Sequence, residues 1–209
     1  FLDGDSCKQL LGILDTIPNP QVGRAIAVLL YTGIRIGELL ALRWEDVFLE
    51  DAVLTVKHTL HRVDGEYKLT SPKTQSSVRA VSLPAEAVEL LKTQKAWQEQ
   101  RKKDVGQRWI ERGAVFTGIY GEYMNGSYMN ATFKKLMKDH DFPDLHIHDL
   151  RHANASLLIN MGVPVKLVAD HLGHANSRVT ENIYAHIFNA TKAQVSTAIS
   201  QALSPCVEQ

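Results

Sequence analysis

Apolar residues recur with a helical period over most of the chain. The stretch SCKQLLGIL, residues 6–14, has this period, with Asp5 or Ser6 as its N-cap. QVGRAIAVLLYTG follows Pro20 and ends at Gly33, and IRIGELLALRW begins a new helix at once. A long charged helix opens at Pro84 and runs to about residue 103. The later helical segments, separated by Gly or Pro, are NATFKKLMKDH, HDLRHANASLLINMG, PVKLVADHLG, SRVTENIYAHIF and TKAQVSTAISQAL.

Between residues 52 and 83 the apolar period changes from helical to alternating. AVLTVKHTLHRV alternates as a strand does, Asp64-Gly65 is a strong hairpin-turn signal, and YKL and SVRAVSL are short strands around the loop TSPKTQS. AVFT predicts one more strand in the loop-rich region 104–128. The pattern therefore predicts an α+β, mainly α, fold, in which one helical domain over residues 1–209 carries a small three-stranded antiparallel β-sheet and ends in a tail helix at 190–209.

The amino-acid composition indicates the class of protein and the redox compartment in which it works. Apolar residues make up 44% and charged residues 22% of the 209 residues, and no apolar run approaches the roughly 20 residues of a membrane helix. The first residues show no signal-peptide pattern, and they begin abruptly, as in a fragment of a longer chain. Cys7 and Cys206 are far apart and belong to no CxxC pair, which favours a reducing compartment. We expect a soluble, cytoplasmic protein.

The net charge of zero hides an uneven distribution. Basic residues outnumber acidic ones between 57 and 79 and again between 92 and 112, whereas acids concentrate at 45–51 in EDVFLED. This segregation permits a basic face that could bind a polyanion. Ordinary solvated charges on helix surfaces explain it equally well.

The stretch HIHDLRH, residues 146–152, gathers three histidines and an arginine before an apolar run. A metal site could use His146, His148 and His152, but no HExxH motif or nearby carboxylate supports it, and Arg151 would repel the ion. Arg151 lies in the predicted first helical turn, where unpaired N–H groups favour an anion. The chemistry therefore favours a phosphate held by His148 and Arg151.

Three further cations lie at the ends of predicted elements, and each has an ordinary interpretation. Arg35 follows the break at Gly33 and could form a surface pair with Glu38. Lys73 lies in a loop between strands, where a solvated lysine is common, and His174 follows Gly173, where it could cap a helix. Each of these signals is weak alone.

Tyr184 departs from the periodicity of its own segment. In SRVTENIYAHIF the apolar stripe is formed by Val179, Ile183 and Ile187. Tyr184 is five residues beyond Val179 and so points roughly 140° away from it. It is either an aromatic residue packed on a neighbouring helix or a functional residue.

The chain resembles the catalytic domain of tyrosine recombinases, the phage-integrase family, over residues 1–202. TGIRIGELLALRW is similar to the first arginine box, SPKTQSSVRAVSL to the β-hairpin lysine region, HDLRHANASLL to the HxxR box, HLGH to the second histidine region and NIYAH to the nucleophile box. The resemblance implies a catalytic set comprising Arg35, Lys73, His148, Arg151, His174 and Tyr184. In it the arginines clamp the scissile phosphate, Tyr184 attacks it, Lys73 protonates the leaving 5′ oxygen, and the two histidines assist.

The resemblance also implies partners. We expect double-stranded DNA attachment sites as substrate, a 3′-phosphotyrosyl intermediate, no metal or other cofactor, and integration or excision of a phage or integrative element. Core-binding and arm-binding domains would lie outside this fragment. The isolated domain should be monomeric, and the full protein should form a homotetramer on DNA, with a possible excision accessory factor. Alternatives are a type IB topoisomerase-like nicking-closing enzyme, a DNA-binding domain without cleavage and a metal-dependent nuclease.

Overall fold

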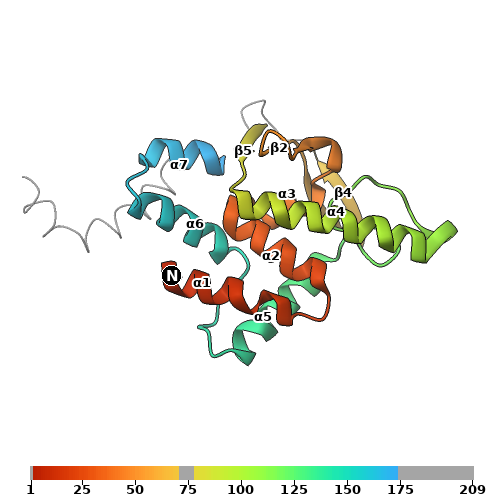
Figure 1. Ribbon diagram of the computed structural model, residues 1–209, viewed down its shortest axis with the longest axis horizontal. Coiled ribbons are helices and arrows are strands. Elements are labelled where there is room, and N and C mark those ends of the chain that lie inside the picture. Colours follow the sequence, from red (N-terminus) through yellow and green to blue (C-terminus); the bar gives the residue numbers. More distant parts are fainter. Residues whose placement is uncertain (1, 71–77, 174–209) are drawn as a thin grey trace, which may run out of the picture.

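A computed structural model describes residues 2–70 and 78–173 (Figure 1). Lys73, His174, Tyr184 and the tail 190–209 lie outside these described residues. The elements, in chain order, are α1 (Gly4–Ile13), α2 (Pro20–Thr32), α3 (Ile36–Ala41), β1 (Val47–Phe48), β2 (Val53–Val56), β3 (Thr59–Val63), β4 (Glu66–Thr70), β5 (Arg79–Ser82), α4 (Ala85–Val105), α5 (Gly126–Asp139), α6 (Asp149–Asn160) and α7 (Val165–Leu172).

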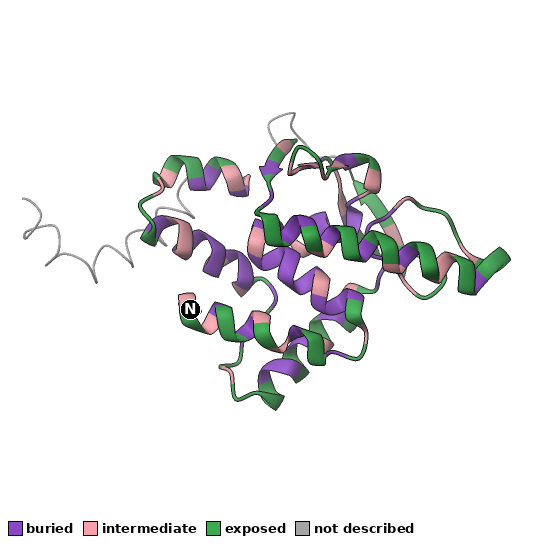
Figure 2. Ribbon diagram, viewed as in Figure 1, coloured by how far each residue is buried: buried purple, intermediate pink, exposed green. Residues whose placement is uncertain are grey.

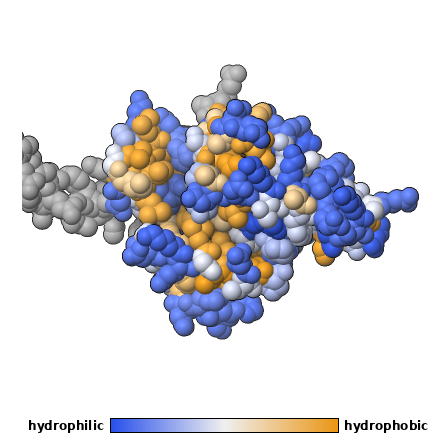
Figure 3. Space-filling view, in the orientation of Figure 1, coloured by the Kyte–Doolittle hydropathy of each residue, from blue (hydrophilic) through white to orange (hydrophobic). Residues whose placement is uncertain are grey.

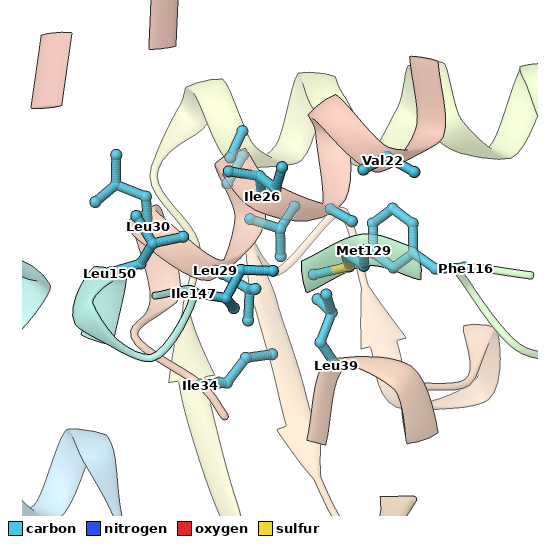
Figure 4. Close-up of a cluster of buried hydrophobic side chains, with 14 of the residues drawn as sticks. Val22, Ile26, Leu29, Leu30, Ile34, Leu39, Phe116, Met129, Ile147 and Leu150 are labelled. Atoms are coloured by element: carbon cyan, nitrogen blue, oxygen red, sulfur yellow. The ribbon is translucent and has the colours of Figure 1, made fainter. Parts of the chain in front are cut away.

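Helix α2 lies at the centre of the fold. It is buried along most of its length and packs against α4 and α6, as Figure 2 shows. Its apolar side chains meet Phe116 and Met129 from the later part of the chain (Figure 4). The buried thiol of Cys7 on α1 belongs to the same core. The helical period of residues 21–33 therefore marks the centre of the core.

Helices α6 and α7 enclose a smaller apolar cluster of their own. Ala155 and Ile159 on α6 contact Val168 and Leu172 on α7. On its other side α7 leaves apolar surface open, including Leu167 at 58% exposure (Figure 3). This cluster fixes the end of α7 against α6, close to the start of the segment that contains His174.

The predicted small three-stranded antiparallel sheet is present, but its strands differ from those expected. AVLTVKHTLHRV divides at Lys57 and His58 into β2 and β3. The three-stranded sheet has the order β1-β2-β5, whereas β3 and β4 form a separate hairpin. Asp64 and Gly65, with φ of 52° and 84°, make the hairpin turn that the sequence predicted. Strand alternation continues through the break, so periodicity could not reveal it.

Two other expectations fail at element boundaries. AVFT does not form a strand of a sheet; it contributes only isolated bridges, Arg43 with Ala114 and Thr117 with Tyr123. The helix predicted from residue 34 begins at Ile36, because Arg35 is extended with ψ of 150° and serves as its N-cap. Arg35 therefore projects from the start of a helix.

None of the helices within residues 2–70 and 78–173 is both long and apolar enough to cross a membrane.

Replacing Ile26 by alanine should destabilise the fold by about 2–5 kcal/mol, because Ile26 is fully buried at the centre of α2 and truncation leaves a cavity. Chemical denaturation followed by circular dichroism measures the change. The matched control is Leu167→Ala on the exposed side of α7, which should change the free energy of unfolding by less than ~0.5 kcal/mol. Equal effects of the two substitutions would contradict this account of the core.

Candidate active site

Arg35 is held at the start of α3 by a capping box with Glu38. The Arg35 backbone N–H donates to Glu38 Oε2 at 2.8 Å, and Arg35 Nη1 donates to Glu38 Oε1 at 2.9 Å. The Glu38 side chain is only 6% exposed, whereas that of Arg35 is 41% exposed. The predicted surface pair is therefore wrong in one respect, because its carboxylate is buried and only its guanidinium reaches solvent.

Arg151 lies in the first turn of α6, as predicted, and is 3% exposed. Its Nη1 donates to the carbonyl of Gly33 at 2.7 Å and its Nη2 to the carbonyl of Leu172 at 2.6 Å. These carbonyls lie at the C-terminal ends of α2 and α7, where helices carry partial negative charge and unpaired acceptors. Arg151 therefore joins the ends of three helices.

Gly33 makes this junction possible. It ends α2 in the left-handed conformation with φ of 63°. A Cβ at Gly33 would lie 2.5 Å from Leu172 Cδ2 and 2.7 Å from Asn154 Oδ1. The close approach of α2, α6 and α7 at this point therefore requires a glycine.

The site holds more positive than negative charge. Burial, followed by the neighbouring charges of Arg35 and Arg79, lowers the pKa of Arg151 to about 9, and Glu38 partly opposes this shift. Burial by itself would raise the pKa of Glu38, but hydrogen bonds and charges from Arg79 and Arg35 hold it below its usual value. Arg35 and Arg79 thus pair with the Glu38 carboxylate, which also partly offsets the charge of Arg151. An anion bound here would be strongly favoured.

His148 is the N-cap residue of α6 and lies on the exposed side of the site. Partial burial, together with the charges of His152, Arg151 and Arg35, lowers the pKa of His148 below its usual 6.5. Its ring meets that of His152 edge-on at 5.0 Å between centroids. At neutral pH the imidazole of His148 is therefore uncharged and can exchange a proton.

The structure brings together the three predicted site residues that it describes: Arg35, His148 and Arg151. Lys73, His174 and Tyr184 fall outside the described residues. Described residues next to His174 and Lys73 do reach the site. Gly173, which precedes His174, has its carbonyl 3.5 Å from Arg35 Nη2, and β5 begins six residues after Lys73.

Two residues of the cluster, Glu38 and Arg79, were not among the predicted site residues. Arg79 pairs with Glu38 across 41 positions of the chain. No spacing rule predicts such a contact. In the sequence nothing distinguishes Arg79 from the other basic residues of the predicted strands. For Glu38 the i, i+3 spacing identified the partner but not its burial.

The described histidines around the site form no recognisable metal centre. Among the residues placed by the structure, no group of three His, Cys, Asp or Glu side chains could hold a metal ion. His146 is exposed, and its ring nitrogen lies 3.8 Å from Asp149.

The basic stretches are partly neutralised by local ion pairs. Lys57 pairs with Asp46 from the acidic stretch, and Lys102 pairs with Glu99 and Glu111. Asp46 therefore offsets part of the surplus in the first stretch, whereas Glu99 and Glu111 belong to the second stretch and leave its surplus of basic residues in place.

Two arginines and a histidine thus converge at helix ends in a mainly helical fold that carries a small antiparallel sheet. The family model for the phage integrase family matches residues 1–191, and the chain belongs to this family. A XerC-like tyrosine recombinase of Caldanaerobacter subterraneus is 34% identical over 173 residues, covering 77% of this chain and 44% of that protein. The ICEBs1 integrase of Bacillus subtilis is 28% identical over 176 residues, covering 82% and 46%.

Solved structures show the same relationship. The Tn1549 transposon integrase in complex with transposon right end DNA superposes with a TM-score of 0.79 at 28% identity, covering 94% of this chain and 65% of that one. The XerA recombinase, at 22% identity and a TM-score of 0.73, shares the fold. The chain spans about half the length of the curated relatives it matches.

The imidazole of His148 should titrate with a midpoint below 6.5, because partial burial and then the neighbouring charges of His152, Arg151 and Arg35 disfavour its protonated form. NMR of the His148 ring proton measures this midpoint. Arg35→Gln should raise it, since one of the repelling charges is removed, whereas Lys166→Gln at an exposed position of α7 should leave it unchanged. A midpoint at or above 6.5 in the unsubstituted protein would disprove this electrostatic description.

Proposed function

We propose that this domain breaks and rejoins DNA strands through a tyrosine nucleophile, as the catalytic part of a site-specific recombinase. The observation that carries the proposal is the surplus of positive charge around Arg35 and Arg151, which a phosphodiester anion would balance. A scissile phosphate gains negative charge in its transition state, and preorganised guanidiniums stabilise that charge.

The two arginines are suited to different parts of this task. Arg35 is the accessible cation, with one Nη bonded to Glu38 and its side chain partly open to solvent. Arg151 uses Nη1 and Nη2 once each for carbonyls, so of its five N–H donors it retains others for a ligand. We propose that both donate to the non-bridging oxygens, with Arg151 as the buried cation and Arg35 as the exposed one.

The remaining roles follow the family resemblance. We propose that Tyr184 attacks phosphorus and forms a 3′-phosphotyrosyl bond, while Lys73 protonates the leaving 5′ oxygen. His148, uncharged at neutral pH, and His174 would assist proton transfer and phosphate binding. The ester conserves the bond free energy for rejoining, so the reaction needs no metal or nucleotide cofactor.

The biological process is proposed for the whole protein, of which this chain is one domain. Curated relatives include an ICEBs1 integrase and a Staphylococcus phage L54a integrase, which supports integration and excision of a mobile element. The integrase of Tn1549 is bound to transposon end DNA, which supports double-stranded attachment sites as the substrate here. A nicking-closing enzyme of the type IB topoisomerase kind remains the alternative with the same chemistry.

We further propose how the full protein assembles in the cytoplasm. Residues 1–209 form its catalytic domain, monomeric in isolation, and N-terminal domains complete the grip on DNA. On its attachment sites the protein would form a homotetramer, in which the tail 190–209 docks on a neighbouring subunit, and an accessory factor would direct excision.

Tyr184→Phe should abolish the covalent protein–DNA adduct and leave DNA affinity nearly unchanged, because it removes the nucleophilic hydroxyl and no cation. The measurement is gel analysis of full-length protein with a nicked attachment-site duplex, beside a binding titration. Arg151→Ala is the comparison, and it should weaken both adduct formation and binding. An adduct formed by the phenylalanine variant would refute the proposed nucleophile, and an adduct abolished by EDTA would point to a metal-dependent nuclease.

The Lys73→Ala variant should cleave ordinary DNA slowly. It should cleave almost normally a substrate in which sulfur replaces the 5′ bridging oxygen. A thiolate leaves without a proton, so a general acid is no longer needed. Single-turnover rates on the two substrates measure the rescue, with Lys68→Ala on β4 as a control that should behave like the unsubstituted protein. Absence of rescue would assign Lys73 to charge stabilisation.

A further inference from the structure

Arg79 is the first residue of β5, and all three nitrogen atoms of its side chain act as donors. Nη1 and Nη2 donate to Glu38 Oε1 and Oε2 at 3.1 and 2.8 Å, and Nε donates to the carbonyl of His171 at 3.0 Å. The side chain is 9% exposed. A two-point guanidinium–carboxylate pair of this kind fixes direction as well as distance.

The carboxylate of Glu38 is shared between two arginines. Each of its oxygens accepts from Arg79 and also from Arg35, through the backbone N–H at Oε2 and through Nη1 at Oε1. The orientation that Arg79 imposes on this carboxylate therefore sets where the guanidinium of Arg35 lies.

The same arginine determines the position of the end of α7. Its Nε bond holds the last turn of that helix, and a Cβ at Gly173 would lie 2.8 Å from Arg79 Nη1. Gly173, with φ of 67°, directly precedes His174. Arg79 thus contacts both α3, which carries Arg35, and the residue before the second predicted site histidine.

We propose that Arg79 is a positioning residue for the cleavage reaction: by orienting the buried Glu38 carboxylate it holds Arg35 in place to receive the scissile phosphate. This inference rests on the proposed function. In this proposal Arg79 acts on Arg35 and not on the phosphate, because its charge is paired with the Glu38 carboxylate, whereas the nitrogens of Arg151 donate to uncharged carbonyls.

The first test compares single-turnover adduct formation by full-length protein at saturating concentration with its affinity for the same nicked duplex. Arg79→Gln should lower the cleavage rate about 100-fold, the cost expected of a displaced catalytic group, with less than about 3-fold loss of affinity, since no phosphate contact is removed. Arg79→Lys, which keeps the charge but not the two-point geometry, should retain an intermediate rate. Thermal melting shows that each variant is folded.

The matched control is Arg43→Gln. Arg43 also pairs with a carboxylate, that of Glu45, and also donates to a backbone carbonyl, that of Arg112, but it lies beyond the opposite end of α3 from Arg35. Its removal should leave the cleavage rate unchanged. Loss of cleavage in proportion to lost thermal stability, in the Arg43 and Arg79 variants alike, would reduce Arg79 to a role in folding and overturn the proposal.

A double-mutant cycle with Glu38→Gln decides whether Arg79 acts through the carboxylate. If it does, the variant with both substitutions should cleave no more slowly than the slower single variant, because the same interaction is lost in each. Rate losses that multiply would contradict the proposal. Failure of the unsubstituted protein to form an adduct would instead refute the proposed function, so the two failures are distinguishable.

Discussion

The arrangement of the site depends on the pairing of the Glu38 carboxylate with Arg35 and Arg79. This carboxylate is buried, and it faces Arg35 and Arg79 directly while opposing the charge of Arg151. An unpaired buried charge costs free energy, so these groups stabilise one another only in this arrangement. The surplus positive charge that remains is a property of the folded state and is available to a bound anion.

The ends of helices complete this arrangement. The carbonyls of Gly33 and Leu172, at the C-terminal ends of α2 and α7, accept from Arg151, whose own helix begins beside His148. Helix C-termini attract cations, and helix N-termini attract anions. The guanidinium is thus anchored on its protein side by carbonyls, while the start of α6 remains suited to a phosphate. The small α6–α7 core keeps these ends together.

Rigidity of this kind suits the proposed reaction on a phosphodiester. Charge that develops on a phosphodiester must be stabilised by groups already in place, because reorientation during the reaction would cost free energy. Arg151 meets this condition through burial, and Arg35 meets it through the capping box and Arg79. The partial exposure of Arg35 leaves the cluster accessible from one side, where His148 also lies.

The sequence by itself determined the class of fold, the family and the helical frame of the site. The helical period marked the central helix α2, the glycine at 33 marked its end, and the order of short motifs identified Arg35, His148 and Arg151, which the structure brings together. These features are local, since periodicity, caps and motif spacing depend on neighbouring residues.

Only the tertiary structure decided which charges meet. It showed that Glu38 is buried, that Arg79 from a distant strand is its partner, and that one alternating segment divides between a sheet and a separate hairpin. A strand that crosses from one sheet to another keeps its alternation, and an ion pair formed across 41 residues leaves no trace in spacing. Contacts of this kind arise from how the elements pack, and that packing is fixed only when the whole core is assembled.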